Sequence, residues 1–79
     1  MKNRVRVEYV EGPAFLAPAL INNDISGMDH NDMVEMYVFL NMLPYGYHIV
    51  STIGCEYMGR FNGLMMNICK YVIHCNNDK

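Results

Sequence analysis

The sequence predicts an α+β fold of two layers, in which a small antiparallel sheet of two to three strands packs against one long and one short helix. Segments with apolar residues at alternate positions, which is typical of half-buried strands, lie on both sides of a central segment whose apolar residues recur at helical spacing. The chain of 79 residues is expected to form a single domain, 1–79, with a thin core, because short chains bury a small fraction of their surface.

The first expected element is a strand over residues 4–10. Val5, Val7 and Tyr9 alternate with charged side chains, so these three are expected on the buried face. The Glu11-Gly12-Pro13 sequence, rich in residues that favour turns, is expected to end the strand.

Two helices are expected next. The short one covers residues 14–22 and carries Pro18 in its first turn, where the missing N–H is tolerated. The long one covers residues 28–43, with Asp29 as N-cap and Asp32 completing a pair that resembles a capping box. The Pro-Tyr-Gly sequence that follows is expected to end it.

The long helix has apolar residues on more than one side. One stripe at helical spacing is expected to face the sheet: Met33, Met36, Tyr37, Leu40 and Leu43. A second set lies off this stripe: Val34, Val38, Phe39 and Met42. Either the segment 14–21 covers this second flank, or another chain does.

The last two expected strands cover residues 47–53 and 67–75, both rich in β-branched and aromatic side chains. The segment between them, 55–66, is interpreted as a loop that is too long for a tight hairpin. The polar tail, 76–79, is expected to fray.

Composition limits the classes of function. A formal charge of −2 and a pI near 5.8 argue against direct nucleic-acid binding, which normally requires a basic surface. No segment approaches the roughly 20 apolar residues that a membrane-spanning helix requires. Three cysteines without the spacing of a disulfide scaffold are interpreted as free thiols, which predicts a cytoplasmic location.

The run from Asn22 to Gly27 imitates the opening of a calcium-binding loop. Asn22, Asp24 and Ser26 occupy the first three ligand positions, but Met33 stands where a bidentate carboxylate is needed. We therefore interpret Asn22, Asp24, Ser26 and Gly27 as a structural turn between two helices, with a metal site as the less favoured alternative.

No pattern in the sequence indicates catalysis or a bound cofactor. Cys55, Cys69, His74 and Cys75 are zinc-type ligands, but they lack the paired spacing of a zinc site. A nucleophilic Cys55 would require a nearby histidine and an orienting carboxylate, and nothing in the sequence places one there. We expect structural thiols, no catalytic or metal-binding residues, and a protein that is not an enzyme.

The distribution of charge is uneven. Between Arg6 and Arg60 there is no lysine or arginine, whereas seven carboxylates lie there. Four of these carboxylates are expected to form a local acidic patch: Asp24, Asp29, Asp32 and Glu35. The patch is either an ordinary solvated surface or a surface that steers a basic partner.

The sequence Ala-Leu-Ile-Asn-Asn-Asp-Ile-Ser-Gly-Met, residues 19–28, resembles a family of small uncharacterised proteins from phages and bacteria. These proteins share the pattern A-L-I-N-G-D-x-S-G-L, and a looser similarity continues through residues 57–63 to the final strand, covering most of the chain. Asn23 replaces the glycine of the pattern, and asparagine tolerates the left-handed backbone conformation that glycine favours. The resemblance implies a phage or prophage setting and no known activity.

Together these observations predict a small non-catalytic protein of a phage or mobile element. It would bind and block a basic or nucleic-acid-binding host protein, such as a nucleic-acid-handling or defence complex, in the host cytoplasm. The candidate partner-binding residues are Asp24, Asp29, Asp32, Glu35, Phe39 and Met42. The alternative is a self-associating structural module, a homodimer joined through the second apolar set of the long helix. A metal-binding protein or thiol enzyme, built on Asp24 or Cys55, is a third and weaker interpretation.

Overall fold

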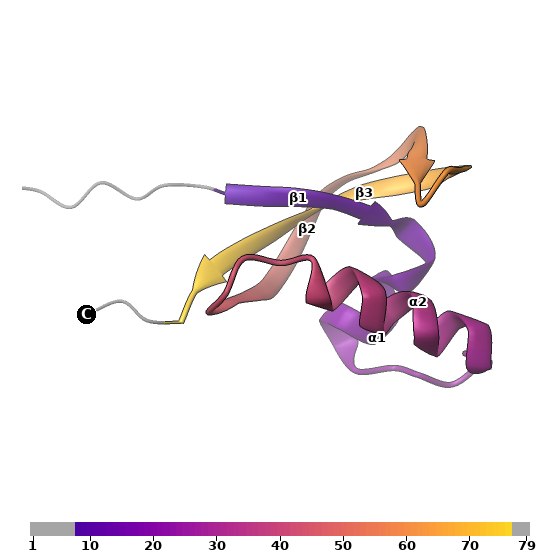
Figure 1. The fold of residues 1–79 in the computed structure, drawn as a ribbon, viewed down its shortest axis with the longest axis horizontal. Helices are drawn as coiled ribbons and strands as arrows, with labels where there is room; N and C mark the ends of the chain where they lie inside the picture. Colours follow the sequence, from indigo (N-terminus) through magenta and orange to yellow (C-terminus); the bar gives the residue numbers. More distant parts are fainter. Residues whose placement is uncertain (1–7, 77–79) are drawn as a thin grey trace, which may run out of the picture.

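The computed structural model describes residues 8–76 and has six elements. They are β1 (Glu8–Pro13), η1 (Ala14–Leu16), α1 (Ala17–Asn22), α2 (His30–Asn41), β2 (Tyr47–Phe61) and β3 (Leu64–Cys75). The strands form one antiparallel sheet in the order β1-β3-β2, and the helices lie together on one side of it (Figure 1). The predicted α+β arrangement, with one short and one longer helix, is confirmed.

Strand β1 differs from the predicted strand over 4–10, whose first four residues lie outside the described part of the chain. The expected end at Glu11-Gly12-Pro13 is wrong, because these residues pair with β3, Gly12 with Cys69. The predicted buried face is also wrong at Tyr9, whose side chain is exposed, while Val10 packs against the core. Gly12 marks a close contact with the core and does not end the strand.

Strands β2 and β3 form a hairpin where the sequence suggested a loop over 55–66. The turn has two residues, Asn62 (φ 54°) and Gly63 (φ 84°), and Phe61 pairs with Leu64 across it. Asn-Gly is strongly favoured in such tight turns because both residues tolerate positive φ. The expectation of a loop is therefore wrong. Two register shifts within β2 interrupt its alternation of buried and exposed residues, and this hid the strand.

Both predicted helices are present with shorter bounds. The first divides into η1 and α1, and Pro18 lies in the first turn of α1 as predicted. Asn23 ends α1 in the left-handed conformation (φ 58°). Asp29 caps α2, because its Oδ1 accepts a hydrogen bond of 2.9 Å from the backbone N–H of Asp32. Satisfying this free helical N–H stabilises the start of α2.

Helix α2 is rotated relative to the predicted orientation, although Met36 of the predicted stripe does pack against the core. Phe39, placed off the main stripe, is only 1% exposed, whereas Tyr37 in that stripe is 70% exposed. The ring of Phe39 lies between two other aromatic rings, with its centroid 6.0 Å from that of Phe61 and 5.1 Å from that of Tyr71. Such aromatic contacts add stability beyond the burial of area, so Phe39 sets the orientation of α2.

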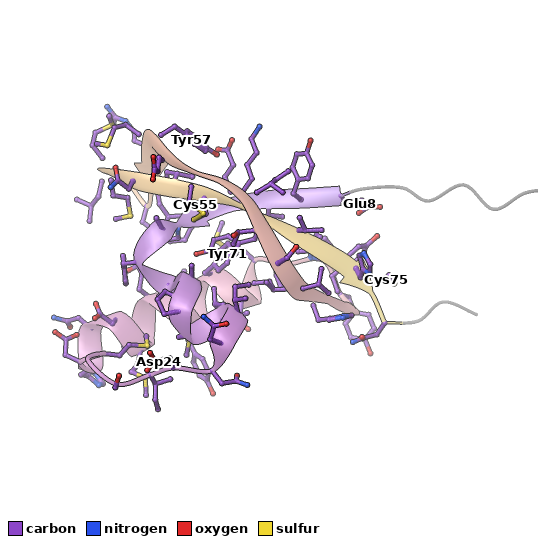
Figure 2. All side chains as sticks on the ribbon, turned by 180° about the vertical axis from the view of Figure 1, so that it is seen from behind. Glu8, Asp24, Cys55, Tyr57, Tyr71 and Cys75 are labelled. Carbon is purple, nitrogen blue, oxygen red and sulfur yellow. A yellow bond between two sulfur atoms is a disulfide. The ribbon has the colours of Figure 1, made fainter. Side chains whose placement is uncertain are left out.

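The buried core joins every layer of the fold: Leu16, Phe39, Phe61, Ile68, Cys69 and Tyr71. The Tyr71 hydroxyl donates a buried hydrogen bond of 2.6 Å to the carbonyl oxygen of Pro13, which connects β3 to the end of β1. Burial raises the pKa of Tyr71 to about 12. Figure 2 shows Tyr71 between the sheet and the helices.

Cys55 and Cys69 form a disulfide, so the interpretation of these two cysteines as free thiols is wrong. Cys55 lies in the second register shift of β2, and Cys69 lies in the central strand β3. The prediction of a cytoplasmic location, which depended on free thiols, therefore loses this support. None of the helices within residues 8–76 is long and apolar enough to cross a membrane. The predicted fraying of 76–79 falls beyond the described residues except at Asn76, whose N–H donates to the carbonyl oxygen of Gly46.

Candidate functional site

The candidate functional site is the side of α2 that points away from the sheet. Four of its apolar side chains are exposed there, and we call them the outward face: Met33, Val34, Tyr37 and Val38. They follow one another at helical spacing and lie opposite Phe39, which is five residues beyond Val34, about half a turn away on a helical projection. Core contacts through Phe39 thus force the outward face toward solvent.

A groove lies along this side of the helix. It has a volume of about 330 Å³ and is lined by five residues of α2: His30, Met33, Val34, Met36 and Tyr37. Met36 lies at its inner border, since this side chain also packs against the core. The flexible thioethers of methionine suit contacts that must adapt to a partner's shape.

The sequence of α2 explains why an apolar surface remains uncovered. From Met33 to Leu40 every residue except Glu35 is apolar or aromatic. A single sheet covers only one side of a helix, and a helix that is apolar on all sides is normally buried on all sides. The segment 14–21 was one predicted cover for the second flank, but Val34 is 47% exposed although α1 contributes to the core. Within the described residues this flank is therefore covered only at Phe39, and Val34, Val38 and Met42 stay exposed.

Two of the predicted contact residues, Phe39 in α2 and Met42 just after it, differ in their exposure to solvent. Phe39 is buried, and its assignment to partner binding is corrected, since a partner cannot reach its side chain in this fold. Met42 directly follows α2 and is 61% exposed. It extends the apolar surface past the C-terminal end of the helix.

Three of the four acidic residues of the predicted patch accept hydrogen bonds within the fold: Asp24, Asp29 and Glu35. Asp24 Oδ1 accepts hydrogen bonds from the backbone N–H of Ser26, at 3.2 Å, and from its hydroxyl, at 2.7 Å. These bonds lower the pKa of Asp24. Figure 2 shows Asp24 on the loop between the helices, away from the sheet. Glu35 Oε2 accepts a hydrogen bond of 2.9 Å from Asn62 Nδ2, which links α2 to the hairpin turn.

The acidic patch is therefore divided. Asp24 and Asp29 are exposed, while Asp32 and Glu35 are half-buried on the side of α2 that faces the hairpin. The four carboxylates therefore do not form one uniformly exposed acidic surface.

Asn22 is the last residue of α1, and the connection that follows it turns at Ser26 and Gly27. Asp24 holds Ser26, and Gly27 has a positive φ of 86°, a conformation that favours glycine. Among residues 8–76, no group of three or more histidine, cysteine, aspartate or glutamate side chains is placed to hold a metal ion. Cys55 is in a disulfide and has no thiol to act as a nucleophile in this state.

Sequence reasoning missed two features, one at the site and one in the sheet. Met33 and Tyr37 were assigned to the core and instead form much of the outward face. The run of apolar residues on both sides of the helix showed that one side could stay exposed, but not which one. The second feature is the Tyr57 hydroxyl of β2, whose oxygen is shielded from solvent and lies near the Glu11 carboxylate. Burial raises the pKa of Tyr57, and the neighbouring Glu11 carboxylate raises it further.

Comparison of the chain with models of protein families, with curated proteins and with solved structures finds no match.

Proposed function

We propose that the chain is a small non-catalytic binding protein that docks on another protein through the outward face of α2. The observation that carries this proposal is the exposure of Met33, Val34, Tyr37 and Val38 on one helix whose opposite side is already packed. Contiguous exposed apolar surface on a small protein is typical of interaction sites. An amphipathic helix face is also a common recognition element between proteins.

The proposed partner is a host protein with basic surface, such as a nucleic-acid-handling or defence complex, which the chain blocks. The excess of carboxylates between Arg6 and Arg60 supports a basic partner, because opposite charge accelerates encounter. The resemblance of residues 19–28 to small phage proteins supports a phage or mobile-element origin and a host target in the cytoplasm. In the cytoplasm, glutathione would keep Cys55 and Cys69 as thiols. The disulfide between them therefore does not support a cytoplasmic location.

The test compares two double variants in capture from a bacterial host lysate. Val34→Gln with Tyr37→Gln removes apolar surface from the outward face and keeps good helix formers. The matched control, Ile53→Gln with Met58→Gln, removes two apolar side chains of β2 that are also exposed.

The proposal predicts that the wild type and the control recover the same protein in stoichiometric amount and inhibit its activity, whereas the α2 variant does neither. Retained capture by the α2 variant contradicts the proposal. Equal loss in both variants also contradicts it, because binding would then depend on general hydrophobicity.

Self-association is the second candidate, since the same face could pair with its copy. Val34, Val38 and Met42 of the predicted homodimer seam are exposed, although Phe39 is not. Light scattering over a concentration series separates the candidates. A dimer that Val34→Gln with Tyr37→Gln dissociates supports self-association, and a monomer at all concentrations excludes it.

A further inference from the structure

We propose that His48 and His74 form a binding site for a divalent transition-metal ion. His48 of β2 and His74 of β3 lie directly opposite each other in the antiparallel pair. Side chains at such positions project from the same face of a sheet, with Cβ atoms about 5 Å apart. Both histidines are exposed, and their ring centroids are 6.3 Å apart.

This spacing suits two imidazoles that share one ion. A zinc–nitrogen bond is about 2.0–2.1 Å long, so two rings on the same ion have centroids roughly 4.5–6.5 Å apart, depending on the angle at the metal. The observed 6.3 Å lies at the wide end of that range, above the roughly 5 Å of a tetrahedral site. Rotation of the exposed side chains can bring the rings closer without any movement of the backbone.

The backbone around the pair is held in place. Tyr47 pairs with Cys75 on one side of the histidines, and Ile49 pairs with Ile73 on the other. Beyond them the N–H of Asn76 donates to the carbonyl oxygen of Gly46, at 2.6 Å. The two imidazoles are therefore presented by a fixed ladder, which reduces the entropy lost when both bind one ion.

The donor set indicates the class of metal. Imidazole nitrogens suit Zn²⁺, Ni²⁺ and Cu²⁺, and hard cations such as Mg²⁺ prefer oxygen. Cys75 follows His74 directly and so projects from the opposite face of the strand. No third ligand is assigned from the described residues, in accord with the lack there of any group of three. Water would fill the remaining positions of the bound ion.

The experiment titrates the untagged full-length chain with Ni²⁺ and, separately, with Zn²⁺ by calorimetry. His48→Ala and His74→Ala each leave a single imidazole. Each is expected to bind roughly tenfold or more weakly than the wild type, because the second imidazole binds at high effective concentration. His30→Ala, on α2, removes the chain's other histidine and is the matched control with wild-type affinity.

A second measurement tests whether the site needs the folded hairpin. An ion that binds only the native pair raises the melting temperature, so Ni²⁺ should raise it for the wild type and for His30→Ala. It should leave the melting temperature of both pair variants nearly unchanged. Equal affinities for the wild type and the pair variants, or an equal loss in His30→Ala, would overturn the proposal.

Discussion

At the scale of single residues, the contact between Gly12 and Phe39 decides how α2 sits on the sheet. A Cβ atom built on Gly12 would lie 2.5 Å from Cε1 of the Phe39 ring, a distance that real Cβ atoms do not tolerate. Gly12 lies in a paired strand, so space, not backbone conformation, requires glycine there.

Gly12→Ala is expected to destabilise the fold by about 1–3 kcal/mol, the usual cost of overpacking a core. In a Phe39→Leu background the added methyl group has room, so the same substitution should cost less. Urea unfolding of the four proteins of this double-mutant cycle measures the coupling between the two sites. Strictly additive free energies would show that the two residues do not compete for space.

Tyr71 predicts how stability depends on alkaline pH. Its pKa is about 12 in the folded protein, above the value near 10 of an unfolded tyrosine. Between these values the unfolded chain releases the proton and the folded protein keeps it, so ionisation favours unfolding. Stability from this group is complete below about pH 10 and falls by up to about 1.4 kcal/mol per pH unit above it.

Unfolding measured from pH 9 to 11 should therefore show a steeper loss of stability in the wild type than in Tyr71→Phe. Tyr71→Phe should also be less stable at neutral pH, by about 1–3 kcal/mol, because the buried carbonyl of Pro13 loses its donor. Tyr45→Phe changes a fully exposed tyrosine and serves as the control. Parallel pH profiles for the wild type and Tyr71→Phe would contradict the assigned cause.

At the scale of elements, the hairpin of β2 and β3 is the most extensive pairing in the fold. The Cys55–Cys69 disulfide joins its two strands across a sequence separation of 14 residues. A cross-link that closes a loop of this length lowers the entropy of the unfolded chain.

Reduction of the disulfide is expected to lower the free energy of unfolding by about 3 kcal/mol in the chain-entropy estimate for a 15-residue loop. Denaturant unfolding with and without a phosphine reductant measures the difference. The double variant Cys55→Ala with Cys69→Ala is the control and should not respond to the reductant. If the reductant leaves the free energy of unfolding of the wild type unchanged, the disulfide does not contribute to the stability of the hairpin.

The elements that local chemistry specifies were predictable from the sequence. Asp29 and Pro18 identify the starts of α2 and α1, because helix capping and the preference of proline for the first helical turn depend only on neighbouring residues. The full length of β2 was not predictable from alternation, since two register shifts change which residues face the core. Asn62-Gly63 was a readable hairpin signal, and the loop interpretation gave it too little weight. The disulfide depends on register, which spacing alone does not reveal.

At the scale of the whole molecule, only part of the candidate site could be predicted. Val34, Val38 and Met42 were identified as a possible contact surface from the excess of apolar residues on one helix. Periodicity could not decide which side of that helix the sheet covers, because both sides are apolar. The position of Phe39 against Phe61 and Tyr71 made that choice, and it depends on three separate elements.

The acidic residues are expected to affect the rate of association more than the final affinity. Asp29→Asn, Asp32→Asn and Glu35→Gln remove three charges and keep side-chain oxygens that can accept the same hydrogen bonds, and asparagine caps helices as well as aspartate. If the partner is basic, the triple variant should bind more slowly, and the difference should shrink at high salt. Surface plasmon resonance at two salt concentrations measures this. If the triple variant associates as fast as the wild type at low salt, these carboxylates do not steer the partner.

The most direct test of the docking surface uses the methionines of the chain as probes. Met33 lies on the outward face of α2, whereas Met58 and Met65 are exposed on the hairpin. Exposed methionines are oxidised to sulfoxides at rates that mass spectrometry resolves residue by residue. With the host partner bound, Met33 should be protected from peroxide while Met58 and Met65 react as in the free chain. Protection of Met58 and Met65 with full oxidation of Met33 would contradict docking through α2.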